Sequence, residues 1–216
     1  LIENCKIVNN TSTNDKQANG GAIYVSFASE MFLMTIKNTT FCNNSCPHSQ
    51  SIGHVIYSPV LYGRLDISNC SFIDNGYNCK ESNSAIYTRS DITMINSNMS
   101  FSDTSNHKIR AMFVGVSSSL SLINTTISNF STEFRTGGSL YYESTDSKEP
   151  VLFEIINNTF EGGNEYGGTD LYLSIIFLPI ILNCTFINKN VHDSDLIVID
   201  YIVDQQDEIL SFDFNN

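Results

Sequence analysis

Ile67–Phe72 reads I-S-N-C-S-F, and phrases of the same shape recur along the whole chain. Six other copies keep the central Asn, and they begin at Ile2, Ile36, Met94, Leu122, Ile155 and Ile181. A decayed eighth copy begins at Leu210. Self-similarity at intervals of 26 to 34 residues is typical of a stacked repeat architecture. The chain is therefore expected to form a single repeat domain over residues 1–216, as a segment of a longer repeat array.

Each repeat holds three short runs rich in Ile, Leu, Phe and Tyr and bounded by Gly, Asn, Ser or Asp. Runs of this length and composition favour β-strands, and no window sustains a helical period. Three strands in each repeat predict an all-β fold. Specifically, we expect a right-handed, single-stranded parallel β-helix, or solenoid, with about seven coils of roughly 30 residues.

In such a solenoid, equivalent residues of successive repeats stack in columns, and the inward columns should be apolar. One predicted inward column comprises Ile7, Phe41, Phe72, Met99, Ile127, Phe160, Phe186 and Phe214. A second comprises Ile23, Ile56, Ile86, Met112, Leu140, Leu171 and Leu196.

The shared Asn lies where the chain must bend between the first and second runs. Asn tolerates a left-handed backbone better than any residue except Gly, and stacked amides can bond to each other. We expect a structural ladder of Asn4, Asn38, Asn69, Asn96, Asn124, Asn157 and Asn183, with Ser211 in the eighth position. A role in ligand binding is the alternative for these residues.

Tyrosines form a further column, in which each follows an inward aliphatic residue and should face outward. Its members are Tyr24, Tyr57, Tyr87, Tyr141 and Tyr172, with Phe113 in the remaining position. An exposed aromatic ladder is a candidate binding face for sugar rings or for an apolar patch on a partner. Two alternatives stay open: the rings stack on one another for stability, or a flanking loop covers them.

Charge is sparse and lopsided, with 16% charged residues and a net charge of −12. No basic stripe is present, which argues against binding to nucleic acid. Seven acidic residues fall among the last 26, and a solvated acidic end or a divalent-cation site would account for them. The four histidines lack the spacing of a zinc site, and no metal or cofactor is expected.

The six cysteines fall into two groups. Cys5, Cys70 and Cys184 each follow a ladder Asn and are interpreted as small side chains in a tight corner. Cys46 and Cys79 occupy the same loop of adjacent repeats, which makes a Cys46–Cys79 disulfide the predicted bridge, with Cys42–Cys46 as the competitor. A bridge would fit an oxidising exterior.

Ten N-x-S/T sequons occur in the chain, five of them at ladder asparagines. A folded corner is expected to hide those five. Asn10, Asn43, Asn98 and Asn129 are then the candidates for surface glycosylation.

Two tetrapeptides carry a family resemblance. Gly20–Ile23 reads GGAI, and both Phe41–Asn44 and Phe72–Asn75 read F-x-x-N. In these motifs the chain resembles the repeat part of the chlamydial polymorphic outer-membrane proteins. The motifs decay elsewhere, to GHVI, NSAI and GGSL. The resemblance implies a surface-displayed adhesin, and it brings no catalytic residues with it.

The leading functional hypothesis is a non-catalytic extracellular or cell-surface segment. Its partners would be a host or cell-surface protein or glycan, together with flanking repeats of the same chain. A carbohydrate-active enzyme, either a pectin-lyase-like polysaccharide lyase or a glycoside hydrolase, is the alternative by fold analogy. Acidic residues on the third runs occur only at Asp170 and Asp195, with Arg89 and Arg110 two or more repeats away. A structural spacer is the third hypothesis.

Overall fold

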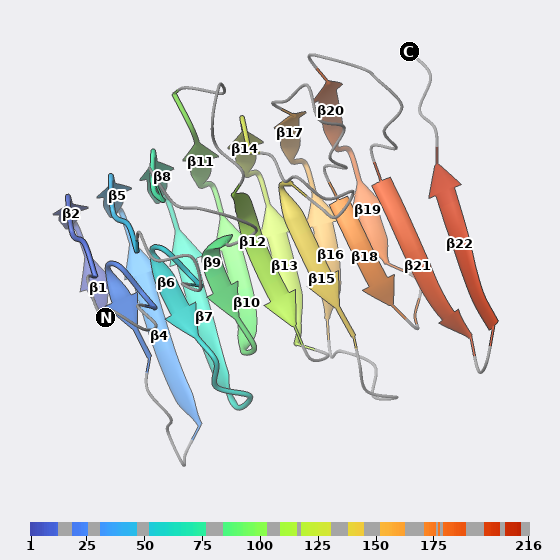
Figure 1. The fold of residues 1–216 in the computed structure, drawn as a ribbon, viewed down its shortest axis with the longest axis horizontal. Coiled ribbons are helices and arrows are strands. Elements are labelled where there is room, and N and C mark those ends of the chain that lie inside the picture. Colours follow the sequence, from blue (N-terminus) through green and yellow to red (C-terminus); the bar gives the residue numbers. More distant parts are fainter. Residues whose placement is uncertain are drawn as a thin grey trace.

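Short strands make up the computed structural model of the protein. It describes residues 1–12, 19–25, 31–46, 52–76, 84–102, 109–115, 118–130, 138–144, 152–162, 171–175, 177, 179–188, 197–203 and 206–212. These residues contain strands, bends and turns but no helix. Three sheets run along the molecule, and successive strands of each sheet come from successive repeats (Figure 1). The predicted all-β solenoid with parallel sheets is confirmed.

Sheet 1 carries the first run of each repeat and contains β1 (Ile2–Glu3), β4 (Phe32–Lys37), β7 (Gly63–Ser68), β10 (Asp91–Ile95), β13 (Leu120–Ile123), β16 (Phe153–Ile156) and β19 (Ile180–Leu182). Sheet 2 carries the second run and contains β2 (Lys6–Val8), β5 (Thr40–Cys42), β8 (Ser71–Ile73), β11 (Asn98–Ser100), β14 (Thr126–Ser128), β17 (Thr159–Gly162) and β20 (Thr185–Asn188). Sheet 3 carries the third run and contains β3 (Ile23–Tyr24), β6 (Ile56–Ser58), β9 (Ser84–Thr88), β12 (Arg110–Gly115), β15 (Leu140–Glu143), β18 (Leu171–Ile175), β21 (Ile197–Val203) and β22 (Gln206–Phe212).

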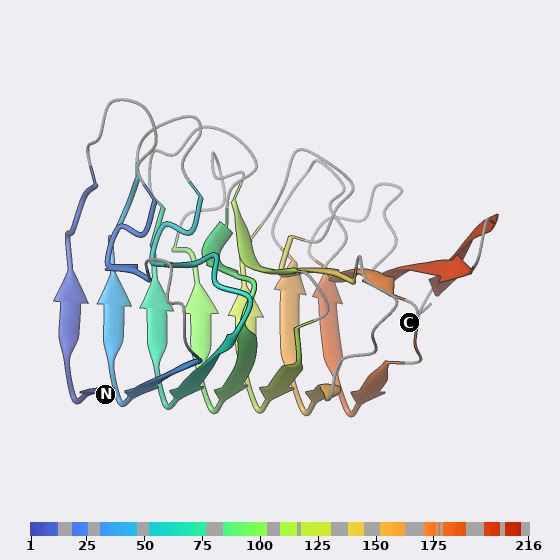
Figure 2. The same cartoon turned by 90° about the horizontal axis from the view of Figure 1, so that it is seen from below.

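Apart from β22, pairing within the sheets is parallel and in register from repeat to repeat. Phe41 pairs with Phe72, and their rings stack with centroids 4.9 Å apart. Phe160 and Phe186 stack in the same way at 5.1 Å. Figure 2 shows the strands of successive repeats standing side by side, with a sharp corner at one end of each. Like side chains therefore lie on like side chains through the interior.

The inward columns are apolar, and most of their members are fully buried. In the first column, Phe41, Phe72, Met99, Ile127 and Phe160 are at most 1% exposed. Ile7 and Phe186, at the two ends of the described column, are partly buried against the same core. Burial of these side chains is the main stabilising term of the fold, since each contributes roughly 1.5–3 kcal/mol relative to exposure.

The last repeat departs from the prediction in two ways. Leu171 pairs with Ile197, so Ile197 ends the second column in place of the predicted Leu196, which is outside the described residues. Ile197 and Ile199 are 3% and 8% exposed, because alternation along β21 turns both inward.

The decayed eighth copy also pairs differently. β22 runs antiparallel to β21, and Ser211 lies opposite Val198 in sheet 3. It therefore does not occupy the eighth position of the asparagine ladder. The chain pairs back on β21 as an antiparallel strand instead of continuing the parallel stack. Phe214, expected in the first column, is outside the described residues.

Candidate functional site

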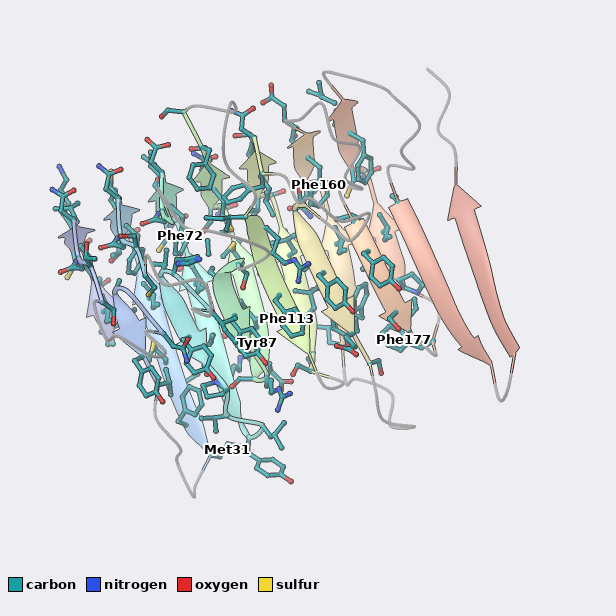
Figure 3. The ribbon with its side chains drawn as sticks, viewed as in Figure 1. Met31, Phe72, Tyr87, Phe113, Phe160 and Phe177 are labelled. Carbon is teal, nitrogen blue, oxygen red and sulfur yellow. The ribbon has the colours of Figure 1, made fainter. Side chains whose placement is uncertain are left out.

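The tyrosine column lies on sheet 3, one strand to each residue. Parallel register joins Tyr24 to Tyr57 and Tyr57 to Tyr87, and Phe113 then joins Tyr87 to Tyr141. Tyr141 pairs in turn with Tyr172. Each ring follows a residue that points into the core, so the column faces outward. Figure 3 shows Tyr87 and Phe113 next to each other on their neighbouring strands.

The rings of this column stack on one another along its whole length. Centroid separations from Tyr24 to Tyr172 are 5.4, 5.3, 4.8, 5.1 and 5.0 Å, and the planes of each pair lie within 22° of parallel. Such offset stacking contributes roughly 0.5–1.5 kcal/mol for each pair beyond the area buried. The column therefore stabilises sheet 3 whatever else it does.

Stacking decides which part of each ring a ligand can touch. Tyr57, Tyr87 and Tyr141 each have a stacked neighbour on both faces, so a sugar ring cannot lie flat on them. Their edges remain accessible, since all three side chains are half-buried. Tyr24, the first member, is 54% exposed and offers the largest accessible ring surface. A partner would meet a row of ring edges rather than a series of separate platforms.

Two arginines accompany the column in an otherwise acidic chain. The guanidinium of Arg110 lies 4.8 Å from the ring centroid of Tyr141, within cation–π range. Burial raises the pKa of Tyr57, the neighbouring Tyr87 and Tyr24 raise it further, and the positive charge of Arg89 opposes this shift. The phenol of Tyr57 is therefore protonated at neutral pH and can both donate and accept a hydrogen bond.

The seven ladder asparagines adopt the left-handed backbone conformation, with φ between 48° and 56°. Each backbone N–H from Asn4 to Asn157 donates to a carbonyl in the next repeat, as Asn96 does to Ile123 at 3.0 Å. Side chains bond at three steps: the Nδ2 atoms of Asn38, Asn69 and Asn124 donate to the Oδ1 atoms of Asn4, Asn38 and Asn96, at 3.2, 3.3 and 3.2 Å.

The expectation that the corner hides the ladder asparagines is wrong, because all seven are exposed. A left-handed residue at this bend directs its side chain out of the corner, and the residue after it points in. Thr39 and Thr125, which follow Asn38 and Asn124, are each 1% exposed. Asn129 is a poor candidate for glycosylation, since its Nδ2 donates to the carbonyl of Phe101 at 2.7 Å.

A second, inner asparagine ladder was not foreseen. It consists of Asn44 and Asn75, the last residues of the two F-x-x-N tetrapeptides, and of Asn10 in the equivalent I-V-N-N of the first repeat. Asn10 Nδ2 donates to Asn44 Oδ1 at 2.8 Å, and Asn44 Nδ2 donates to Asn75 Oδ1 at 3.0 Å. Asn44 and Asn75 are at most 3% exposed. The repeated F-x-x-N tetrapeptide could have predicted this ladder. The structure explains both of its fixed residues, since the Phe fills the core and the Asn amide bonds across the corner.

The structure tests only part of the cysteine predictions. Cys42 carries a free thiol, so the competing Cys42–Cys46 bridge is not formed. Cys79 lies outside the described residues, which leaves the predicted Cys46–Cys79 bridge a prediction. Cys46 is buried, and burial raises the pKa of its thiol to about 11 although a backbone hydrogen bond to Gly21 lowers it. Cys70 and Cys184 face carbonyl oxygens in the corner that follows the ladder.

The structure tests the candidate metal-binding groups but not the acids considered for catalysis. Asp170 and Asp195, the two acids considered for catalysis, lie outside the described part of the chain, whereas Glu143 on β15 is a further acid of sheet 3 within it. Within it, His, Cys, Asp and Glu side chains form no group of three or more that could hold a metal ion. His54 is fully buried, with its Nδ1 accepting a hydrogen bond from the backbone N–H of Cys46 at 3.3 Å.

Comparison of the chain with protein-family models, curated proteins and solved structures finds no match in any of the three. Among the described residues, no helix has the length and apolar character needed to cross a membrane. Functional inference therefore rests on the geometry of the chain itself.

Proposed function

We propose that the chain is a non-catalytic binding segment displayed outside the cell or at its surface. The observation that carries this proposal is the tyrosine column on sheet 3. Tyrosine and arginine are the residue types enriched at binding hot spots, and Arg89 and Arg110 accompany the column. The partner would be a host or cell-surface protein or glycan. Because the inner ring faces are stacked, a partner would contact ring edges and phenol hydroxyls, with Tyr24 as the exposed end.

The proposed architecture is a right-handed, single-stranded parallel β-helix of about seven coils. Two observations support it. Nearly all parallel crossover connections in one sheet are right-handed. Sheets 1 and 2 each contain seven strands, one from each of the first seven repeats. A winding of this kind presents long, regular faces rather than one deep pocket, which suits a binding or adhesive role.

The resemblance to polymorphic outer-membrane proteins supports the same proposal. It rests on GGAI and F-x-x-N, whose structural reasons are now clear. Gly21 lies where an added Cβ would be only 2.4 Å from the carbonyl oxygen of His54 and 2.8 Å from that of Ser45. Gly20 and Gly53 both have left-handed φ, of 67° and 66°. These motifs serve the stack, and membership of the family stays part of the proposal.

A matched pair of variants tests the tyrosine face on an array of glycans and immobilised cell-surface proteins. Tyr87→Ala with Tyr141→Ala removes two rings, whereas Tyr87→Phe with Tyr141→Phe keeps the stack and removes only the hydroxyls. We expect the alanine variant to lose at least about tenfold in affinity for any probe that the wild type binds. Phe113, which stacks at 4.8 and 5.1 Å without a hydroxyl, indicates that the phenylalanine variant folds.

The phenylalanine variant then divides the contribution of the hydroxyls from that of the rings. Binding that is unchanged in the alanine variant would contradict a role for this face. Absence of binding to every probe would favour the spacer hypothesis instead. Circular dichroism of both variants shows whether the strands are retained.

A further inference from the structure

The residue directly before each ladder asparagine faces outward, and its character changes along the molecule. In the first three repeats this position holds Glu3, Lys37 and Ser68. In the next four it holds Ile95, Ile123, Ile156 and Leu182, which we call the aliphatic stripe. Parallel register on sheet 1 places these four residues in one column. A position that should face water has become aliphatic in four consecutive repeats.

Exposure shows that the stripe lies on the outer face and not in the core. Met94, Leu122 and Ile155, one residue earlier in each strand, are fully buried. The stripe residues alternate with them: the first three are half-buried, and Leu182 is 52% exposed. Ile180 widens the stripe on β19. It is 48% exposed and follows Glu154 in the neighbouring outward column.

Strand propensity alone explains a single outward isoleucine, since β-branched residues fit strands. It does not explain an unbroken run of four. Strands about 4.8 Å apart make this run about 14 Å long, and contiguous apolar surface of this kind marks an interaction site more often than scattered residues do.

We propose that the aliphatic stripe is where a second copy of this chain packs, sheet 1 against sheet 1. Charge is the first argument. Two chains with a net charge of −12 repel each other over most of their surface. Beside the stripe lie the uncharged ladder asparagines on one side and Thr93, Ser121 and Glu154 on the other. Glu154 accepts a hydrogen bond from Ser121 Oγ at 2.6 Å. The surface around the stripe therefore carries little charge, so an acidic partner can approach it without strong repulsion.

Spacing is the second argument. Side chains that repeat once for each strand need a partner surface that repeats at the same distance, and another β-sheet has that spacing. A twofold axis perpendicular to the stripe lets the two columns interdigitate, so that the same patch serves both copies. Two sheets packed in this way lie about 10 Å apart. The short stripe predicts a weak dimer, with a dissociation constant in the micromolar to millimolar range.

Sedimentation equilibrium between about 10 μM and 1 mM, in roughly 150 mM salt, tests the proposal. Ile123→Thr with Ile156→Thr keeps the branched β-carbon that strands favour but makes the stripe polar. We expect the dissociation constant to rise at least about tenfold. Leu33→Thr is the matched control, because Leu33 is 65% exposed on β4 of the same sheet but lies outside the stripe.

A gain-of-function variant keeps the test independent of misfolding. Ser68→Ile extends the stripe by one repeat, since Ser68 pairs with Ile95, and should tighten the dimer several-fold. A wild-type chain that stays monomeric at 1 mM overturns the proposal. A dimer that persists in the threonine double variant would also overturn it. The same holds for a dimer that Leu33→Thr or Tyr87→Phe weakens as much as the threonine double variant does.

Discussion

At each ladder corner, two consecutive residues have opposite tasks. The left-handed asparagine turns the chain and faces water, and the next residue enters the corner and bonds to carbonyl or amide groups. Ser97 shows the second task, since its Oγ accepts a hydrogen bond from the backbone N–H of Cys70 at 3.2 Å and donates to the carbonyl of Ile95 at 3.0 Å. Asparagine is needed at the first position for its backbone more than for its amide, because only three ladder steps have a side-chain bond.

This division predicts how Asn96 responds to substitution. Asn96→Ala leaves at φ of 50° a residue without the short polar side chain that lets Asn adopt the left-handed region, and we expect this to lower the free energy of unfolding by up to about 1–2 kcal/mol. Asn96→Gly avoids that cost and loses only an exposed amide bond to Asn124. Urea unfolding should therefore place the midpoint of the alanine variant clearly below that of the glycine variant. Equal midpoints would show that the amide, and not the backbone, is what the corner requires.

His54 gives the fold a pH dependence. Burial lowers the pKa of His54 to about 4, below its usual 6.5, so the unfolded chain binds a proton more readily than the folded one between these values. The contribution of the neutral His54 to the free energy of unfolding is fully present above pH 6.5. It is lost as the pH falls from there towards 4, by at most about 1.4 kcal/mol for each pH unit. Unfolding midpoints at pH 7, 6 and 5 measure this slope.

His54→Ser is the control for that measurement, because the next repeat already carries Ser84 at the equivalent position. The variant should lose the part of the slope that belongs to the histidine. An unchanged slope in the serine variant would assign the pH dependence to the carboxylates instead.

At the scale of strands and sheets, periodicity was sufficient to predict most of the architecture. A parallel stack makes each repeat a copy of the one before, so a column read from the sequence is also a column in space. Phe41, Phe72 and Phe160 illustrate this in the core, and Tyr57 and Tyr87 on the outer face. The prediction is wrong where the repeat decays: the register of β21 is one residue away from the predicted one, and β22 reverses direction.

The direction of the side chains at the corners could not be predicted from the sequence pattern. Residue type indicates that Asn69 tolerates a left-handed backbone, but not whether the side chain then points to solvent. The inner ladder was missed for the same reason: the F-x-x-N motif does not show that the left-handed residues Asn43 and Asp74 turn the chain just before Asn44 and Asn75. The tyrosine column was predictable in position, whereas stacking of the rings on both faces is a matter of χ angles that no spacing reveals.

At the C-terminal end of the molecule, the three sheets end in two different ways. Among the described residues, the last strands of sheets 1 and 2 are β19 and β20, where Leu182 and Ile187 are 52% and 44% exposed. Sheet 3 continues through β21 and ends with β22, which pairs antiparallel to β21 over seven residue pairs. A parallel sheet edge that is left open templates the addition of further strands. β22 therefore covers the parallel edge of β21 and is itself the edge strand of sheet 3, formed by the segment in which the repeat has decayed.

Truncation after Val203 removes β22 and exposes the edge of β21. We expect the shortened chain to self-associate into higher oligomers at concentrations where the full 216-residue chain does not, with light scattering rising over hours. Replacing Ile209 with Pro in the full chain is the matched variant, since proline cannot donate to the ladder of hydrogen bonds with β21. If both variants remain as dispersed as the wild type, the hairpin has no protective role, and the open edges of β19 and β20 would be the ones that govern association. If the stripe variants change association and the β22 variants do not, then dimerisation depends on sheet 1 and is independent of β22.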